Sequence, residues 1–184
     1  MKEKKKRIAV FCGSRTGNHP EYEKATKELA RQMVDSNIDL VYGGGKIGLM
    51  GILADEVMRL GGAVYGVIPV KILDMEVGHD GITELIVVET MHDRKAEMAK
   101  MSDGFVALPG GIGTMEEIIE VYTWQQLGYH NKPCGFFNVL GYFDAMISFL
   151  DEMVEKNFLS ADIRDRIIVK DSAKYIVESF IQEM

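Results

Sequence analysis

The stretch GFVALPGGIGTMEE, from Gly104 to Glu117, passes from an apolar strand to a helix through a turn rich in glycine. The strand-like part ends at Leu108, and a helical pattern continues to about Leu127. Glycines at such a turn leave backbone N–H groups uncovered at the positive end of the helix dipole, where phosphate groups commonly bind. The stretch therefore predicts a strand–turn–helix unit with an anion site at the turn.

The rest of the chain repeats this alternation of strands and helices. Apolar runs predict strands at residues 7–12, 39–42, 63–68, 84–88, 104–108, 134–138 and 167–169. Helical periodicity predicts helices at residues 20–37, 49–60, 91–101, 114–127, 143–156 and 173–182. The strands are almost continuously apolar, as in parallel sheets that are covered on both faces. The sequence therefore predicts a single α/β domain over residues 1–184, a doubly wound, Rossmann-like parallel sheet with helices on both faces.

The composition excludes several classes of function. The net charge of −7 disfavours nucleic acid as a partner. No apolar run approaches the ~20 residues that cross a bilayer, so no membrane association is expected. Cys12 and Cys134 lie in apolar, strand-like segments without the spacing of metal ligands. We therefore expect a cytoplasmic protein with reduced cysteines, no metal site and no cofactor.

Two other glycine-rich turns follow predicted strands at the carboxyl edge of the sheet, where such folds bind ligands. The turn CGSRTGNHP, residues 12–20, lacks GxGxxG, and Tyr42 rather than an acidic residue ends the second strand, which disfavours NAD. Ser14 is a candidate for nucleotide binding, with a plain turn as the alternative. The turn YGGGKIGLMG, residues 42–51, lacks the GKS or GKT of a Walker A loop, which disfavours NTP hydrolysis. Its three successive glycines predict a ligand lying on bare backbone: Gly43, Gly44 and Gly45.

The segment TMHDRKAEMAKMS carries a cation on the apolar face of a predicted helix. Met91 and Met98 mark the face that turns inward, and Arg94 shares it. Buried arginines nearly always have an anionic partner. Arg94 is therefore predicted to clamp an anion, with a structural ion pair as the alternative. Lys95 is a weaker candidate, because its long stem can carry the charge out to solvent.

The two glutamates of the opening stretch receive different roles. If Thr114 is the N-cap of its helix, Glu117 is the third helical residue, and the two form a capping box. Glu117 is then a structural residue. Glu116 has no such role and lies at the mouth of the predicted anion site. We therefore predict Glu116 as the catalytic carboxylate.

Six motifs together make the chain similar to a known family: FCGS, YGGGKIGLMG, GVIP, MHDRK, PGGIGTMEE and WQQLGYHNKP. Over nearly its whole length the sequence resembles the LOG family, often labelled "lysine decarboxylase-like", whose signature is PGGxGTxxE. The resemblance implies a cytokinin riboside 5′-monophosphate phosphoribohydrolase, which cleaves the N-glycosidic bond of AMP or a cytokinin riboside 5′-monophosphate to free base and ribose 5-phosphate. It also implies a homodimer, weakly supported by apolar residues near a helix end, Trp124, Leu127 and Tyr129.

The resemblance also implies roles for individual residues. The family's catalytic arginine falls on Arg94 and its catalytic glutamate on Glu116. Substrate-binding positions fall on Lys95 and on the glycine-rich turn: Gly110, Gly111, Ile112, Gly113, Thr114 and Met115. A carboxylate can stabilise an oxocarbenium-like ribose and activate water. Arginine is too basic to give up its proton, so Arg94 is expected to act as an electrostatic clamp.

Two other functions are compatible with these residues. One is a non-catalytic nucleotide or molybdenum-cofactor carrier of the same fold, against which the combination of Arg94 and Glu116 argues. The other is an enzyme of the same class that acts on a different nucleotide. The loop MEVGHDG, residues 75–81, departs from the plant pattern and leaves the preferred base open. No motif marks a lysine aldimine or a pyridoxal phosphate site, so the decarboxylase label receives no support.

Overall fold

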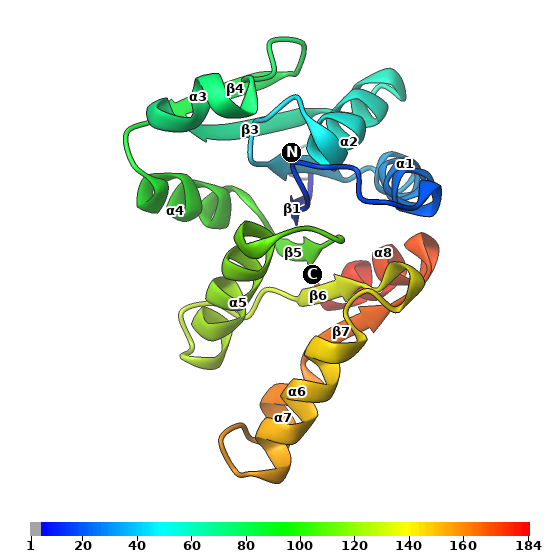
Figure 1. Cartoon of the computed structure of the whole chain (residues 1–184), viewed down its shortest axis with the longest axis vertical. Helices are drawn as coiled ribbons and strands as arrows, with labels where there is room; N and C mark the ends of the chain where they lie inside the picture. Colours follow the sequence, from blue (N-terminus) through cyan, green and yellow to red (C-terminus); the bar gives the residue numbers. More distant parts are fainter. Residues whose placement is uncertain (1–4) are drawn as a thin grey trace.

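The apolar runs of the sequence form one parallel β-sheet (Figure 1). The structure is a computed structural model that describes residues 5–184 and, within that range, every side chain except those of residues 74–76. Seven strands pair in the order β4-β3-β2-β1-β5-β6-β7, and every pairing is parallel. The strands are β1 Arg7–Phe11, β2 Asp39–Tyr42, β3 Val64–Pro69, β4 Glu84–Val88, β5 Gly104–Ala107, β6 Cys134–Phe137 and β7 Ile167–Lys170.

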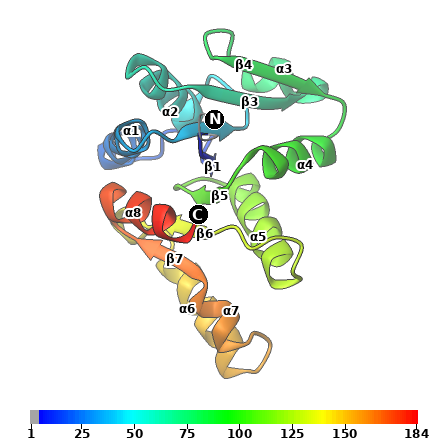
Figure 2. The same ribbon diagram turned by 180° about the vertical axis from the view of Figure 1, so that it is seen from behind.

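Helices cover both faces of this sheet (Figures 1 and 2). They are α1 Pro20–Asp35, α2 Gly48–Arg59, α3 Val70–Glu76, α4 Met91–Met101, α5 Ile112–Gln126, α6 Asp144–Glu155, α7 Ala161–Asp165 and α8 Ala173–Glu183, with a short 3-10 turn η1 at Val139–Gly141. Helices α1, α2 and α8 bury Leu29, Leu53 and Ile176 in the hydrophobic cluster on one face. Helices α4 and α5 bury Met98 and Ile118 in the cluster on the other. The predicted doubly wound α/β fold is confirmed.

Local chemistry explains where several helices begin. Pro20 is the first residue of α1, and the His19 side chain accepts a hydrogen bond from the backbone N–H of Glu21 at 3.2 Å. Helix α4 begins with a capping box in which Thr90 and Asp93 each accept a backbone N–H of the other. In each helix, a side chain at the N-cap therefore accepts one backbone N–H of the first turn.

Two short helices differ from the predicted elements. Helices α3 and α7 occupy segments that periodicity predicts as connections. With seven and five residues, both are too short to show an amphipathic period in the sequence. Within residues 5–184, no helix is both long enough and apolar enough to cross a membrane.

The order of the strands creates the crevice that positions the site. Strand β1 pairs with β2 on one side and with β5 on the other, so the chain winds outward in opposite directions from the β1–β5 pair. Ligands of such sheets bind at this switch point, beyond the carboxyl ends of the strands. Here the Gly13 N–H donates to the Pro109 carbonyl at 3.1 Å, and the Leu49 N–H donates to the Gly13 carbonyl at 3.0 Å. The turns after β1, β2 and β5 therefore meet at one place.

Candidate active site

A cavity of about 300 Å³ lies where these three glycine-rich turns meet. Glycine backbone, two methionines and three charged side chains form most of its wall. The lining residues are Val10, Phe11, Cys12, Gly13, Ser14, Gly43, Met50, Met91, Arg94, Gly111, Ile112, Gly113, Thr114, Glu116 and Glu117. Both predicted catalytic residues and three of the six predicted glycine positions, Gly43, Gly111 and Gly113, are therefore in one cavity.

The N-terminus of α5 forms one wall of the cavity. Gly111 is its N-cap and provides no side chain, and the first intrahelical bond of the turn runs from the Met115 N–H to the Gly111 carbonyl at 3.2 Å. The N–H groups at the start of a helix have no acceptor within the helix. A Cβ atom on Gly111 or Gly113 would meet nothing within 4 Å, so the backbone there is open to a ligand. This geometry suits a phosphate group at the positive end of the helix dipole.

The predicted capping box at this helix is wrong. The N-cap of α5 is Gly111, three residues before the predicted N-cap Thr114, so Thr114 lies inside the first turn and is buried. The reason is close packing. A Cβ atom on Gly110 would collide with the Thr114 hydroxyl oxygen, so this side chain lies directly under the Gly110 backbone. Glu117 therefore does not form a capping box with Thr114.

Arg94 points into the cavity, as predicted from its place among methionines. Its side chain is 6% exposed, and its Nη2 atom lies 3.4 Å from Oε1 of Glu117, whose side chain is 13% exposed. A Cβ atom on Gly43 would collide with the same Nη2 atom, so the guanidinium rests on bare backbone. A charged pair this deeply buried is costly to break, because removing one partner leaves the other charge in a dry environment.

Glu116 has a different partner at the rim of the cavity. Its Oε1 atom lies 2.5 Å from Nζ of Lys95, and the Glu116 side chain is 49% exposed. Lys95 also binds Oε1 of Glu120 at 3.1 Å and does not line the cavity. Burial alone would lower the pKa of Lys95, but the hydrogen bonds from Lys95 to Glu116 and Glu120 raise it more, so the pKa lies above its ordinary value. Lys95 therefore stays charged and holds Glu116 at the surface.

The spacing of the signature also distinguishes the two glutamates. Counted along this chain, PGGxGTxxE begins at Pro109 and ends at Glu117. The glutamate of the signature is therefore Glu117, and it is Glu117 that lies against Arg94. The motif itself contained this signal, which was obscured by the predicted helix start at Thr114.

Not every predicted binding residue reaches the cavity. Gly44 has φ of +79° and faces β3, because a Cβ atom there would meet Ile68 and Leu85. Met115 packs into the hydrophobic cluster beneath the sheet. The predicted positions outside the cavity lining are Gly44, Gly45, Lys95, Gly110 and Met115. Met50 and Met91 line it without having been predicted as ligand contacts, since methionines at helical spacing indicate packing.

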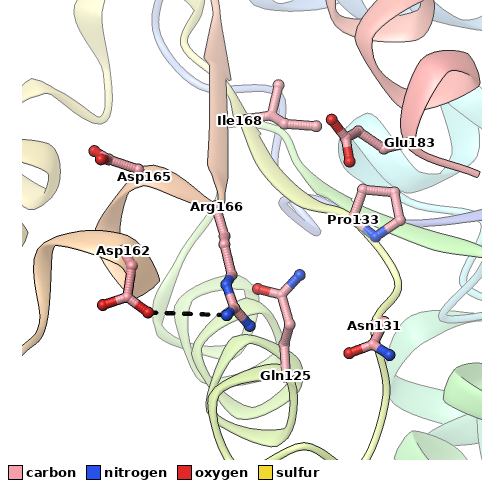
Figure 3. Close-up of a pocket in the computed structure, with 8 residues that line it drawn as sticks. All are labelled: Gln125, Asn131, Pro133, Asp162, Asp165, Arg166, Ile168 and Glu183. Atoms are coloured by element: carbon pink, nitrogen blue, oxygen red, sulfur yellow. Dashed lines mark ion pairs between the residues drawn. The ribbon is translucent and has the colours of Figure 1, made fainter.

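A larger cavity, of about 520 Å³, lies at the opposite edge of the sheet (Figure 3). It lies beside the amino ends of β6 and β7, and on one wall Arg166 pairs with Asp162, four residues earlier in the chain, at 3.9 Å. No glycine-rich turn and none of the predicted site residues belongs to its lining. Across the part of the chain that the structure describes, no three His, Cys, Asp or Glu side chains are grouped to hold a metal ion. The candidate active site is therefore the smaller cavity.

Comparison with known proteins identifies the family. A family model described as "Possible lysine decarboxylase" matches residues 50–180. The chain is 50% identical over 178 residues to cytokinin riboside 5′-monophosphate phosphoribohydrolase LOG1 of Arabidopsis thaliana, a match that covers 97% of this chain and 84% of that protein. It is 48% identical over 178 residues to LOG3 of the same plant, covering 97% and 83%. The chain belongs to the LOG family.

Solved structures share the fold of this LOG-family chain. The molybdenum cofactor carrier protein from Chlamydomonas reinhardtii matches with a TM-score of 0.73 and 20% identity, over 97% of this chain and 98% of that one. The molybdenum cofactor binding protein from Rippkaea orientalis matches with a TM-score of 0.72 and 20% identity, over 97% of each chain. At this identity the likeness concerns the fold alone. Four of the six LOG signature residues, Gly111, Gly113, Thr114 and Glu117, line the cavity of this chain.

Proposed function

We propose that this protein hydrolyses the N-glycosidic bond of a nucleoside 5′-monophosphate, either AMP or a cytokinin riboside 5′-monophosphate, to free base and ribose 5-phosphate. The observation that carries the proposal is the arrangement of the cavity, in which the Arg94–Glu117 pair shares one space with the open N-terminus of α5. Family membership supports it, because relatives that match nearly the whole chain bear the name of this activity.

The N-terminus of α5 supplies the binding site for the 5′-phosphate. Backbone N–H groups at Gly111, Ile112 and Gly113 point out of the first turn without intrahelical acceptors, and hydrogen bonds to a charged phosphate are the stronger kind. Glycine keeps this backbone uncovered. The phosphate then anchors the ribose over the Arg94–Glu117 pair, so binding energy from a remote group is used at the reacting carbon.

Glu117 is the carboxylate that we assign to the chemical step. Cleavage of the bond between C1′ and the base builds positive charge on the ribose, which a carboxylate in a mostly dry cavity stabilises. The electron pair of the broken bond leaves with the base, and water activated by Glu117 adds its oxygen to C1′. Solvent returns a proton to the base, since Arg94 is too basic to donate one. Arg94 orients Glu117 and clamps the anionic substrate.

Glu116 is the alternative carboxylate, because it also lines the cavity. Its pairing with Lys95 at the rim and its exposure favour a role in substrate entry or in cavity shape over the chemical step. The two glutamates are neighbours in sequence with different partners. Separate replacement of each by glutamine therefore distinguishes their roles.

The proposed activity is tested with a panel of nucleotides. Purified protein is incubated with AMP, a cytokinin riboside 5′-monophosphate, GMP, CMP and UMP, and free base and ribose 5-phosphate are separated by chromatography. Equal amounts of the two products from at least one nucleotide support the proposal, and the panel identifies the preferred base. Tight binding of nucleotide without release of any base would favour a carrier.

We further propose that the protein is a cytoplasmic homodimer. Ile112 at the start of α5 is 86% exposed, and Leu127 and Tyr129 beyond its end are also exposed, so apolar side chains flank the helix at both ends. Cys12 and Cys134 are buried thiols, as is usual in a reducing compartment. Light scattering at micromolar concentration tests the dimer, and a monomeric mass would contradict it.

A further inference from the structure

The backbone of Gly43, Gly44 and Gly45 sets the position of Arg94. A Cβ atom on Gly43 would collide with the Nη2 atom of Arg94, so the guanidinium lies directly on this turn. On its other side the turn packs closely against β3, where a Cβ atom on Gly66 would lie 2.8 Å from the Cα atom of Gly44. A shift of the turn toward Arg94 would therefore displace the guanidinium, and close packing against β3 limits a shift in the other direction.

A loop between α3 and β4 holds this glycine turn in place. The Lys46 N–H donates to the Val77 carbonyl at 3.0 Å, and the His79 N–H donates to the Gly44 carbonyl at 2.9 Å. Gly45 and Gly78 form an antiparallel bridge between these two bonds. The loop thus pairs with the turn as a short extra strand, and its own position determines that of the turn.

The His79 side chain in turn fixes the loop. It is 3% exposed, and its Nε2 atom lies 3.0 Å from Oδ1 of Asp55 on α2. Its Nδ1 atom accepts the Gly81 N–H at 3.1 Å, so the ring proton is on Nε2 and is donated to Asp55. The imidazole of His79 therefore connects the loop to α2 through Asp55 and stabilises the loop itself through Gly81. His79 does not line the active-site cavity.

We propose that His79 is a positioning residue for Arg94, and this inference rests on the proposed function. The imidazole holds the loop at residues 77–81, the loop holds the glycine turn by backbone pairing, and the turn holds the guanidinium beside Glu117. A displacement of about 1 Å at a reacting group can cost on the order of 10²-fold in rate. Loss of the imidazole therefore lowers activity without any contact between His79 and the substrate.

The test is a double-mutant cycle on AMP hydrolysis. His79→Ala is expected to lower kcat/KM about 10- to 100-fold in the wild-type background. It is expected to change kcat/KM less than about 2-fold in an Arg94→Lys background, because residues that act through one another are not additive. His79→Asn is expected to restore part of the loss, since its side-chain oxygen can accept the Gly81 N–H in place of Nδ1.

A matched control separates positioning from stability. Glu56 is next to Asp55 on α2 but binds Arg59 instead of the loop, with 2.6 Å between Oε1 and Nη2. Glu56→Gln is expected to lower the unfolding temperature and leave kcat/KM unchanged. Equal losses from His79→Ala in both backgrounds, or no recovery in His79→Asn, would overturn the positioning role.

A different measurement tests the role of His79 if the proposed activity is absent. If the wild-type protein releases no base from any nucleotide, the proposed function is wrong, and the same cycle is measured on the Kd for AMP by calorimetry. Non-additive changes in Kd still support the link between His79 and Arg94, and additive changes overturn it. A wild-type protein that neither hydrolyses nor binds any nucleotide of the panel overturns both proposals.

Discussion

Replacing Gly113 by alanine separates binding of the phosphate from stability of the fold. Gly113 is the second residue of α5 and lines the cavity, and an added Cβ atom there would meet nothing within 4 Å. The methyl group therefore costs the empty protein nothing through contact, and alanine is the better helix former. A phosphate bound to the first turn, in contrast, would meet the methyl group where it approaches the backbone N–H groups.

The size of the effect follows from the hydrogen bonds at stake. A hydrogen bond to a charged group contributes about 1.5–3 kcal/mol, so the loss of one contact lowers kcat/KM for AMP about 10- to 160-fold. Helix propensity favours alanine by at most about 1 kcal/mol, and by less at a helix end. The unfolding temperature is therefore expected to stay constant or to rise by no more than about 4 °C.

The assay compares AMP with adenosine for the wild-type protein and for Gly113→Ala. The wild-type protein should prefer AMP by at least about 10²-fold, because two such contacts are absent in the nucleoside. The variant should lose much of this preference while its rate with adenosine stays the same. A wild-type ratio near one, or a variant that hydrolyses AMP within 2-fold of the wild-type rate, would show that the turn does not bind the phosphate.

Three further predictions concern the glutamates, a cysteine and metal ions. Glu117→Gln should lower kcat by at least about 10²-fold with nucleotide binding retained, whereas Glu116→Gln should retain most of kcat; the reverse result in steady-state kinetics would exchange their roles. Burial raises the pKa of Cys134 to about 12 from 9.0. The native thiol should therefore resist iodoacetamide at pH 8, and the contribution of this thiol to stability should fall by about 1.4 kcal/mol per pH unit as pH rises from about 9 toward 12, because only the unfolded thiol loses its proton there. Chemical denaturation at pH 8 and 10.5 measures this fall, and an unchanged stability would contradict it. Hydrolysis should persist after exhaustive EDTA treatment, and recovery of a lost activity by Zn²⁺ or Mg²⁺ would contradict that expectation.

Sequence alone was sufficient for the fold, and it placed the candidate site at the edge of the sheet where the structure has a cavity. Continuous apolar strands such as Arg7–Phe11 indicate a sheet buried on both faces, and that pattern is local to each segment. Glycines after the predicted strands then mark the carboxyl edge, since a chain that alternates strands and helices returns each turn to that edge. The inward direction of Arg94 was equally readable from Met98, four residues further along α4, and both side chains are buried, whereas Met91 at the start of the helix is exposed.

Only the tertiary structure decided which groups meet. The start of α5 depends on packing between Gly110 and Thr114 against the turn after β1, and no helical period reports such a contact. The pairing of Arg94 with Glu117 rather than Glu116 depends on how α4 and α5 lie beside each other. The orientation of Gly44 toward β3 and the role proposed for His79 depend on contacts between segments that are distant in the sequence. Periodicity records which side of an element avoids water, but a contact between two elements depends on their relative placement in space, which no single segment encodes.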